Sequence, residues 1–205
     1  MSEVRRDWIA FLGGATRYTN DQLRAAYACG AELGRRGKHL ITGATNGIPY
    51  AAALGAKDAG ALVVGVSPAA SASEHAGRFG RPLSAADFIV YSGLGVDGRA
   101  PLILRGAAAA IFIGGEMGTL AEFAAAWICG CPCLGLLESA GGITAELPHL
   151  VSSMTTTWGS AIVRADDAVD LATRVCAAVD AAGGSALYEG DRVLQVTEAV
   201  ADLRS

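Results

Sequence analysis

Short, almost wholly apolar segments alternate with amphipathic helical patterns along most of this chain, and this alternation constrains the fold more than any other feature. Strands are predicted at 8–14, 39–44, 61–68, 87–93, 109–115, 132–138 and 161–167. Strands that lack polar alternation are typical of a parallel sheet buried under helices on both faces. The pattern therefore predicts an α/β fold, a doubly wound single domain with about seven mainly parallel strands.

Helical patterns fill the intervals between these strands. Helices are predicted at 20–37, 47–60, 118–130 and 168–184, with a short helix at 99–107. Asn20 is expected to cap the first helix, and Pro49 lies near the start of the second. The segment 69–86 is interpreted as a loop or mobile segment, and 144–154 as a helix or irregular segment. Residues 183–205 are interpreted as a C-terminal appendage with one short helix at 191–203.

Composition narrows the range of partners. The 205 residues are 52% hydrophobic and 18% charged, which indicates a folded globular protein with a substantial core. A net charge of −4 without an obvious basic face argues against nucleic acid as a partner. We expect no membrane association and a cytoplasmic location, because no secretory signal or spanning segment is evident and five cysteines suit a reducing compartment.

Cys129, Cys131 and Cys133 have a spacing that raises the question of a metal site. Alternate residues of a strand share a face, so Cys131 and Cys133 could point together. No second cluster of cysteine or histidine lies nearby in the sequence. We therefore interpret these cysteines as small buried residues and predict no metal site.

Glycine-rich turns follow three of the predicted strands, at 13–16, 43–47 and 114–119. The carboxyl ends of parallel strands meet at one edge of the sheet, where α/β proteins bind ligands. The dinucleotide signature G-x-G-x-x-G is absent from the first turn, which argues against an NAD enzyme. The first two turns contribute these ligand-binding candidates: Gly13, Gly14, Gly43, Thr45, Asn46 and Gly47.

The third turn, Gly114–Glu122, has the chemistry of an anion site. A helix that begins near Gly118 presents unpaired backbone N–H groups and a partial positive charge to a ligand. Glu122 lies one helical turn after Thr119 and faces the same zone, although the same spacing is also that of a capping box. The candidates here are Gly115, Glu116, Met117, Gly118 and Thr119 for phosphate binding, with Glu122 for catalysis.

The turn and its surroundings resemble the Lonely Guy proteins, a Rossmann-like superfamily also described as lysine decarboxylase-like. The family motif is P-G-G-x-G-T-x-x-E, and residues 114–122 of this chain read GGEMGTLAE. An arginine fifteen positions before the motif is typical of the family, and Arg99 occupies that position. The resemblance covers roughly residues 8–182, so that 1–182 is expected to form a Rossmann-like nucleotide-binding domain.

The resemblance implies a phosphoribohydrolase that cleaves nucleoside 5′-monophosphates to free base and ribose 5-phosphate, not a lysine decarboxylase. The glycine turn and Thr119 would hold the phosphate, while Arg99 and Glu122 would be catalytic. Glu122 would stabilise positive charge on the ribose or position water. No cofactor is required by this chemistry. Relatives are dimers or larger, so we expect a homodimer or higher homo-oligomer, with Phe123 and Trp127 as candidate interface residues.

Two departures from the motif leave a second function open. Gly114 replaces the leading proline, and Glu116 replaces the second glycine. The first change also occurs in a related branch that includes molybdenum cofactor carrier proteins, which implies a non-catalytic carrier or sensor with molybdenum cofactor as its ligand. A carboxylate at Glu116 would repel phosphate if it were desolvated, and would do so much less if it points to water.

The remaining candidates are weaker. Asp97 and Tyr91 lie near the end of the fourth predicted strand and could line the pocket. His39, His75 and His149 have no partner at a recognisable spacing, and we interpret them as structural or exposed residues.

Overall fold

The computed structural model describes residues 7–153 and 160–181, and the structural statements below concern these residues. Its sheet has seven strands in the order β4-β3-β2-β1-β5-β6-β7, and all neighbouring pairs are parallel. The predicted doubly wound α/β fold is confirmed. The strands are β1 (Trp8–Gly13), β2 (His39–Thr42), β3 (Val63–Ser67), β4 (Phe88–Tyr91), β5 (Ala109–Ile113), β6 (Cys133–Leu137) and β7 (Ala161–Ala165).

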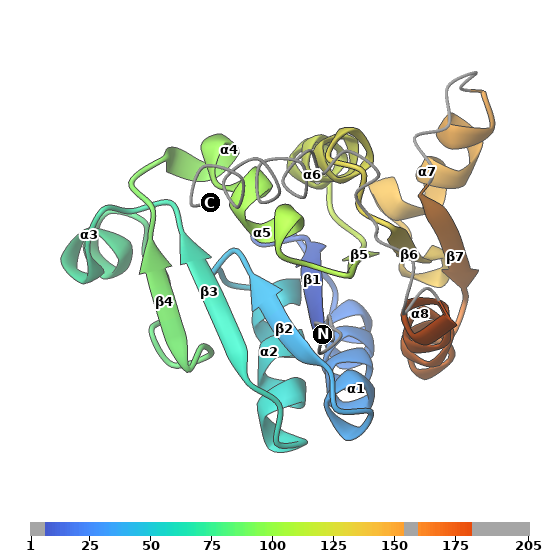
Figure 1. Cartoon of the computed structure of the whole chain (residues 1–205). Helices are drawn as coiled ribbons and strands as arrows, with labels where there is room; N and C mark the ends of the chain where they lie inside the picture. The colour runs from blue at the N-terminus through green and yellow to red at the C-terminus, as the bar shows by residue number, and fades with distance from the viewer. Residues whose placement is uncertain (1–6, 154–159, 182–205) are drawn as a thin grey trace, which may run out of the picture.

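Helices cover both faces of the sheet (Figure 1). One face packs against α1 (Asn20–Arg35), α2 (Ile48–Asp58) and α8 (Ala168–Ala181). The other packs against α5 (Ala100–Arg105), α6 (Met117–Ile128) and α7 (Ile143–Ser152). Strands β5 and β6 are buried along their whole length, which explains their continuous apolar sequences.

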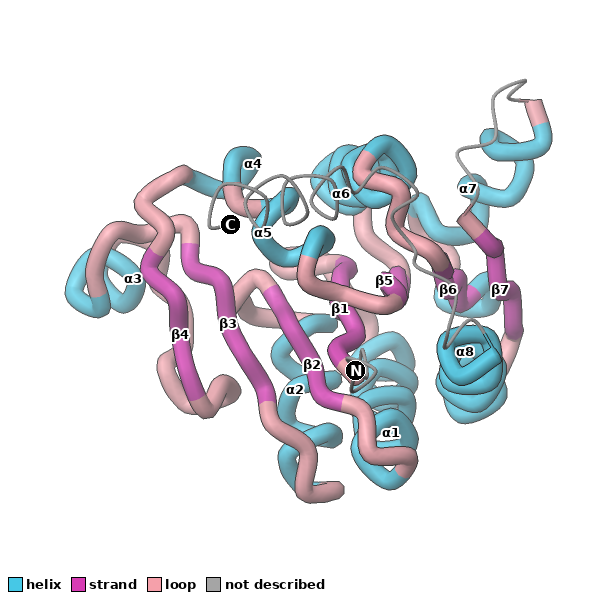
Figure 2. The backbone as a smooth tube through the Cα atoms, in the orientation of Figure 1, coloured by secondary structure: helices cyan, strands magenta, loops and turns pink. Residues whose placement is uncertain are grey.

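The strand order reverses between β1 and β5. The chain builds β1 to β4 outward in one direction, and then returns to place β5 on the other side of β1, as the backbone trace shows (Figure 2). Gly13 at the end of β1 therefore pairs with Ile113 at the end of β5. In open α/β sheets ligands bind at this switch point, outside the carboxyl ends of the strands.

Two helix starts differ from the sequence-based expectation. The N-cap of α1 is Thr19, not Asn20: its Oγ1 accepts from the backbone N–H of Gln22 at 3.1 Å, and the Gln22 side chain accepts from the Thr19 N–H at 2.8 Å. The segment 69–86 is not only a loop, because it contains α3 (Ala72–Gly77), whose N-cap is Ser71. The start of α1 is a capping box, which satisfies two otherwise unpaired backbone donors, and Ser71 caps α3 by accepting from the Glu74 N–H at 3.2 Å.

The other boundaries shift by a few residues. The strands are shorter than predicted at one or both ends, and the short helix expected at 99–107 forms as α5, which a further short helix, α4 (Gly95–Gly98), precedes. The segment 144–154, left open between helix and irregular structure, forms α7, which is preceded by a 3₁₀ turn η1 (Glu138–Ala140). The appendage predicted at 183–205 lies outside the described residues.

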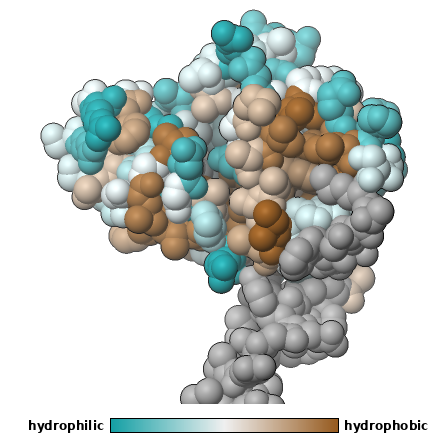
Figure 3. Space-filling view, turned by 90° about the horizontal axis from the view of Figure 1, so that it is seen from above, coloured by the Kyte–Doolittle hydropathy of each residue, from teal (hydrophilic) through white to brown (hydrophobic). Residues whose placement is uncertain are grey.

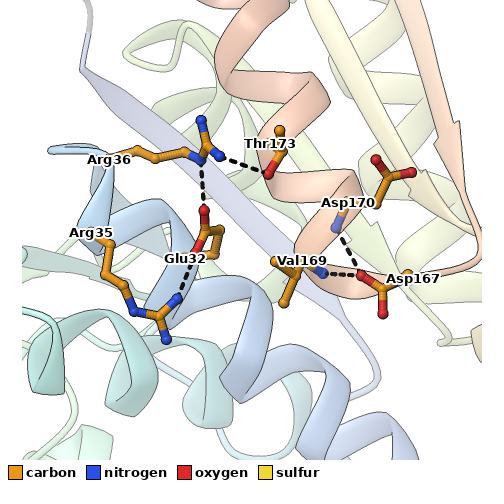
Figure 4. Close-up of polar contacts among 7 residues, drawn as sticks. All are labelled: Glu32, Arg35, Arg36, Asp167, Val169, Asp170 and Thr173. Carbon is orange, nitrogen blue, oxygen red and sulfur yellow. Dashed lines mark hydrogen bonds and ion pairs between the residues drawn. The ribbon is translucent and has the colours of Figure 1, made fainter.

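A polar seam joins α1 to α8 (Figure 4). Glu32 accepts from Arg35 at 2.5 Å and from Arg36 at 2.8 Å, and Arg36 also donates to the Thr173 hydroxyl at 2.9 Å. Asp167 caps α8 by accepting from two backbone N–H groups of its first turn.

Among the described residues, none of the helices has the length and the apolar character that a membrane span requires.

Candidate functional site

A cavity of about 360 Å³ lies at the carboxyl edge of the sheet, beside the β1–β5 switch point. Its walls come from the glycine turns after β1, β2 and β5, from the first turns of α6, and from the segment around α4 and α5. The structure brings these predicted site residues to it: Gly13, Gly14, Gly43, Thr45, Arg99, Gly115, Glu116, Gly118, Thr119 and Glu122.

Three predicted ligand-binding residues do not line this cavity. The Asn46 side chain donates instead to the carbonyl of Gly80 at 3.3 Å. Gly47 starts α2 with a φ of +71°, where its close approach to Gly14 leaves no room for a side chain. Met117 is 73% exposed on the outer side of α6. Spacing in the sequence predicted the turns, and backbone geometry decides which of their residues face the cavity.

The first turn of α6 is free of side-chain caps. The helix starts at Met117 with Glu116 as N-cap, and no side chain accepts from its first backbone N–H groups. Thr119 and Glu122 therefore do not form a capping box, and that interpretation of their spacing is wrong. Gly118 and Thr119 line the cavity at this helix start. Unpaired donors and a positive helix end that border a cavity suit an anionic group.

The glycines before α6 are required by the backbone. Gly114 and Gly115 have φ values of +59° and +83°, in the region that side chains disfavour. A Cβ on Gly115 would lie 2.1 Å from the Thr119 hydroxyl oxygen. Thr144 at the start of α7 holds the turn, because its Oγ1 accepts from the Gly114 N–H at 2.9 Å. The conformation of the turn is thus stabilised by a tertiary hydrogen bond as well as by its glycines.

Arg99 is buried in the cavity wall, with only 4% of its surface exposed. Its Nη1 donates to the carbonyls of Gly43 and, at 3.2 Å, Val66, while its buried Nε has no hydrogen-bond partner among the described residues. A Cβ on Gly43 would lie 2.6 Å from Nη2. Burial, followed by the positive charge of Arg81, lowers the Arg99 pKa to about 10, so the guanidinium remains charged at neutral pH.

Glu122 projects from the second turn of α6 into the same cavity. Burial raises the pKa of its carboxyl group to about 7, although the positive charges of Arg99 and Arg81 act in the opposite direction. Within residues 7–153 and 160–181, the carboxylate has no hydrogen bond or ion pair. A half-ionised, unpaired carboxyl group in a cavity wall is typical of a functional position.

Arg81 is a cavity residue that the sequence did not identify. It follows α3 in the segment interpreted as a loop, and its Nη1 donates to the Gly43 carbonyl at 3.3 Å. Burial lowers its pKa, and the charge of Glu122 partly compensates for this. The spacing of Ser71 and Glu74 is the signal that would have revealed α3. Nothing in the local sequence indicates that Arg81 reaches the cavity.

Glu116 lies at the mouth of the cavity, where it is exposed and pairs with Arg17 at 3.2 Å. Both side chains are largely in water, so this ion pair contributes at most about 1 kcal/mol to stability. The carboxylate is therefore neither desolvated nor buried against the helix start. Of the two expectations for this departure from the motif, the outward-pointing one is observed.

The other residues singled out in the sequence differ in whether they line the cavity. Asp97 lines the cavity as expected, whereas Tyr91 does not and packs edge-on against His75, with ring centroids 5.9 Å apart. His75 is fully buried. Phe123 and Trp127 belong to the core of their own subunit, where they pack between α6 and the sheet, so their assignment to an interface is wrong.

Cys131 and Cys133 are buried, and Cys129 is partly exposed. Burial raises the pKa of both the Cys131 and the Cys133 thiols to about 12, so neither is a ready thiolate ligand. Among the described residues, no group of three or more histidine, cysteine, aspartate or glutamate side chains has a geometry that could hold a metal ion.

The all-parallel, doubly wound sheet with a polar cavity at its switch point defines a Rossmann-like α/β protein. The sequence profile of the SLOG cluster4 family matches residues 6–165, and the chain belongs to this family. No curated protein matches the sequence.

Solved structures share the fold. TM1055 superimposes with a TM-score of 0.69 at 22% identity, covering 83% of this chain and 98% of that one. The molybdenum cofactor binding protein of the phototrophic bacterium Rippkaea orientalis gives 0.67 at 23% identity, covering 86% and 99%. The molybdenum cofactor carrier protein of Chlamydomonas reinhardtii gives 0.64 at 24%, covering 86% and 99%. At these identities the likeness establishes the fold alone.

Proposed function

We propose that this protein is a phosphoribohydrolase that cleaves the N-glycosidic bond of a nucleoside 5′-monophosphate. The observation that carries the proposal is the unpaired Glu122 carboxyl group, which faces the cavity one helical turn beyond the uncapped start of α6. The 5′-phosphate would bind the backbone donors of Gly118 and Thr119. The ribose would then lie beside Glu122, between the phosphate and the two cavity arginines.

The chemistry consumes one water and releases the base and ribose 5-phosphate. As the bond between C1′ and the base nitrogen breaks, its electron pair leaves with the base and positive charge develops on the ribose ring. The ionised Glu122 carboxylate would stabilise that charge and orient the water that attacks C1′. Arg99, charged and fixed by two carbonyls, would bind the anionic or hydroxyl groups of the sugar phosphate.

The experiment is to incubate the full chain with a panel of nucleoside 5′-monophosphates and to detect free base and ribose 5-phosphate by chromatography. The proposal predicts release from at least one nucleotide, and loss of at least about a hundredfold in rate for Glu122→Gln and for Arg99→Ala. Arg24→Ala, which removes an exposed arginine paired with Asp21 on α1, should leave the rate unchanged. A rate that survives Glu122→Gln would contradict the proposal.

A second candidate is a non-catalytic carrier of a phosphorylated pterin such as molybdenum cofactor. The specific observations that favour it are the fold likeness to the two molybdenum cofactor proteins and the presence of Gly114 and Glu116 in the turn. The same uncapped start of α6 would hold the terminal phosphate of the pterin. Binding of the pterin, detected by its fluorescence after oxidation, with no turnover of any nucleotide would favour the carrier over the hydrolase.

A further inference from the structure

The segment between β3 and β4 approaches the cavity through Arg81, and its neighbours hold it there. Its backbone is bonded to the turn after β2, because Asn46 donates to the Gly80 carbonyl. On the other side of Arg81, the Ser84 hydroxyl lies 3.2 Å from the phenol oxygen of Tyr50 on α2. These contacts place the segment beside the carboxyl end of β2 rather than in solvent.

His75 holds this segment in place through hydrogen bonds to the backbone of Arg81 and Pro82. The His75 backbone carbonyl accepts from the Arg81 N–H at 3.1 Å, and the ring Nε2 lies 3.1 Å from the Pro82 carbonyl oxygen. A carbonyl only accepts, so Nε2 carries a proton and donates to Pro82, while Nδ1 lies 2.8 Å from the Ser67 hydroxyl oxygen. The fully buried ring thus connects Ser67 at the end of β3 to the Pro82 carbonyl, while the His75 backbone carbonyl accepts from the Arg81 N–H.

The Arg81 side chain projects from this anchor into the cavity wall. Its Nη1 shares the Gly43 carbonyl with Arg99, so that two guanidinium groups converge on one oxygen. Its charge acts on Glu122 across the cavity. A guanidinium has five N–H donors, so donors remain for a ligand that lies beside Glu122.

Arg78, in the same segment, provides a comparison because its side chain does not reach the cavity. It is largely exposed, forms an ion pair with Glu74 at 2.8 Å one turn back on α3, and does not line the cavity. Both arginines lie over the ring of Phe79, at 5.2 Å for Arg78 and 5.8 Å for Arg81. The two side chains therefore share a chemistry and a segment, and differ in which way they point.

We infer that Arg81 is a ligand-binding residue of the cavity, positioned by the buried pair His75 and Ser67, and that it donates to the sugar-phosphate portion of the ligand next to Glu122. This assignment rests on the proposed binding of a phosphorylated sugar or nucleotide. It gives the β3–β4 segment a role in recognition that neither the glycine turns nor Arg99 supplies.

The first test measures binding of ribose 5-phosphate to the full chain by calorimetry. Arg81→Gln is expected to weaken binding by about tenfold, which is typical of losing a charged hydrogen bond, while Arg78→Gln leaves it unchanged. His75→Leu should weaken binding to a similar degree, and His75→Gln, which keeps a donor for the Pro82 carbonyl, should restore part of it. Equal losses for Arg78→Gln and Arg81→Gln, or no loss for Arg81→Gln, would overturn the inference.

A second measurement separates failure of this inference from failure of the proposed function. In the ligand-free chain, the Glu122 carboxyl titration is followed by NMR in wild type, Arg81→Gln and Arg78→Gln. Removal of Arg81 should raise the Glu122 pKa, because a nearby positive charge is lost, and removal of Arg78 should not. If wild type binds no ribose 5-phosphate, the proposed function fails while this titration still decides whether Arg81 lies in the cavity. An unchanged Glu122 pKa in Arg81→Gln would overturn the inference.

Discussion

At the scale of single residues, the Glu122 carboxyl group combines burial, two nearby guanidinium groups and the lack of a direct partner among the described residues. Its pKa of about 7 lies above the value of about 4.3 for an unfolded chain. The ionised form is therefore disfavoured in the folded state. The cost to stability is absent at low pH, grows as pH rises from about 4 to 7, and is complete above pH 7.

Glu122→Gln should consequently stabilise the protein at pH 8 while abolishing any catalysis. The expected gain in the free energy of unfolding is about 1–3 kcal/mol at pH 8, and close to zero at pH 4, where the carboxyl group is protonated in both states. Urea denaturation at the two pH values measures this. The control Glu146→Gln, at an exposed glutamate of α7, should change stability by less than about 0.5 kcal/mol. No gain at pH 8 would show that Glu122 titrates normally.

The same carboxyl group predicts the pH dependence of the proposed reaction. Only ionised Glu122 stabilises positive charge on the ribose, so kcat/KM should rise with pH and level off above about pH 7. The measurement is a rate profile from pH 5.5 to 8.5 with a nucleotide that the enzyme cleaves. Since the second ionisation of the substrate phosphate occurs near pH 6, its pKa must be determined separately by titration of the free nucleotide. A rate that is flat across this range would exclude Glu122 as the titrating group.

At the scale of elements, the start of α7 stabilises the glycine turn before α6. Thr144 is fully buried, accepts from the Gly114 N–H and donates to the carbonyl of Gly141 at 2.9 Å. The Ile143 N–H donates to the Gly115 carbonyl at 2.9 Å. The conformation of the turn therefore depends on α7, which follows it in the sequence only after α6 and β6.

Thr144→Val keeps the shape of the side chain and removes the hydroxyl. We expect a loss of about 1–3 kcal/mol in the free energy of unfolding, because the Gly114 N–H is left buried without a partner. Ligand affinity should fall as well, since the turn loses its fixed conformation. Thermal denaturation and calorimetry measure the two effects. Thr173→Val, which removes a hydroxyl from the seam between α1 and α8, is the control and should leave ligand affinity unchanged.

At the scale of the whole molecule, the outer surface of α6 carries exposed apolar residues. Met117, Ala124 and Ile128 are exposed and recur at helical spacing, so α6 carries exposed apolar side chains on one side. The view from above shows strongly hydrophobic residues at the surface of this side of the molecule (Figure 3). Exposed apolar side chains that gather on one side of a helix are typical of a contact surface.

We therefore propose that the protein is a homodimer and that α6 lies at the subunit contact. Ile128, which is 65% exposed, then replaces Phe123 and Trp127 as the expected contact residue. Ile128→Asp should convert a dimer to a monomer in sedimentation velocity at micromolar concentration, because a charge buried at an apolar contact is costly. Leu62→Asp, at an exposed leucine next to β3, should leave the dimer intact. A wild-type protein that is monomeric at every concentration would exclude the homodimer.

The sequence predicted those parts of the protein whose structure depends on residues that are close together in the chain. The β5–α6 unit is an example. Apolar strand residues, two glycines and an amphipathic helix follow one another directly along the chain, so the sequence alone predicts the turn and its candidate phosphate site. Glu122 and Arg99 were also found, because a family motif carries their spacing. The N-caps at Thr19 and Ser71 are equally local and could have been recognised, since both have the signature spacing to a glutamine or glutamate.

Tertiary structure alone decided which groups meet across the sheet. Arg81 enters the cavity because β3 lies two strands from β1 and because the buried His75 directs the segment after β3 back over the turn that follows β2. The raised pKa of Glu122 likewise comes from residues that are distant in sequence and from burial by the whole fold. The sequence by itself determined the elements and the turn chemistry, because these depend on neighbours along the chain. The charge environment of the cavity depends on contacts made only when the strands pair, so it could be known only from the folded molecule.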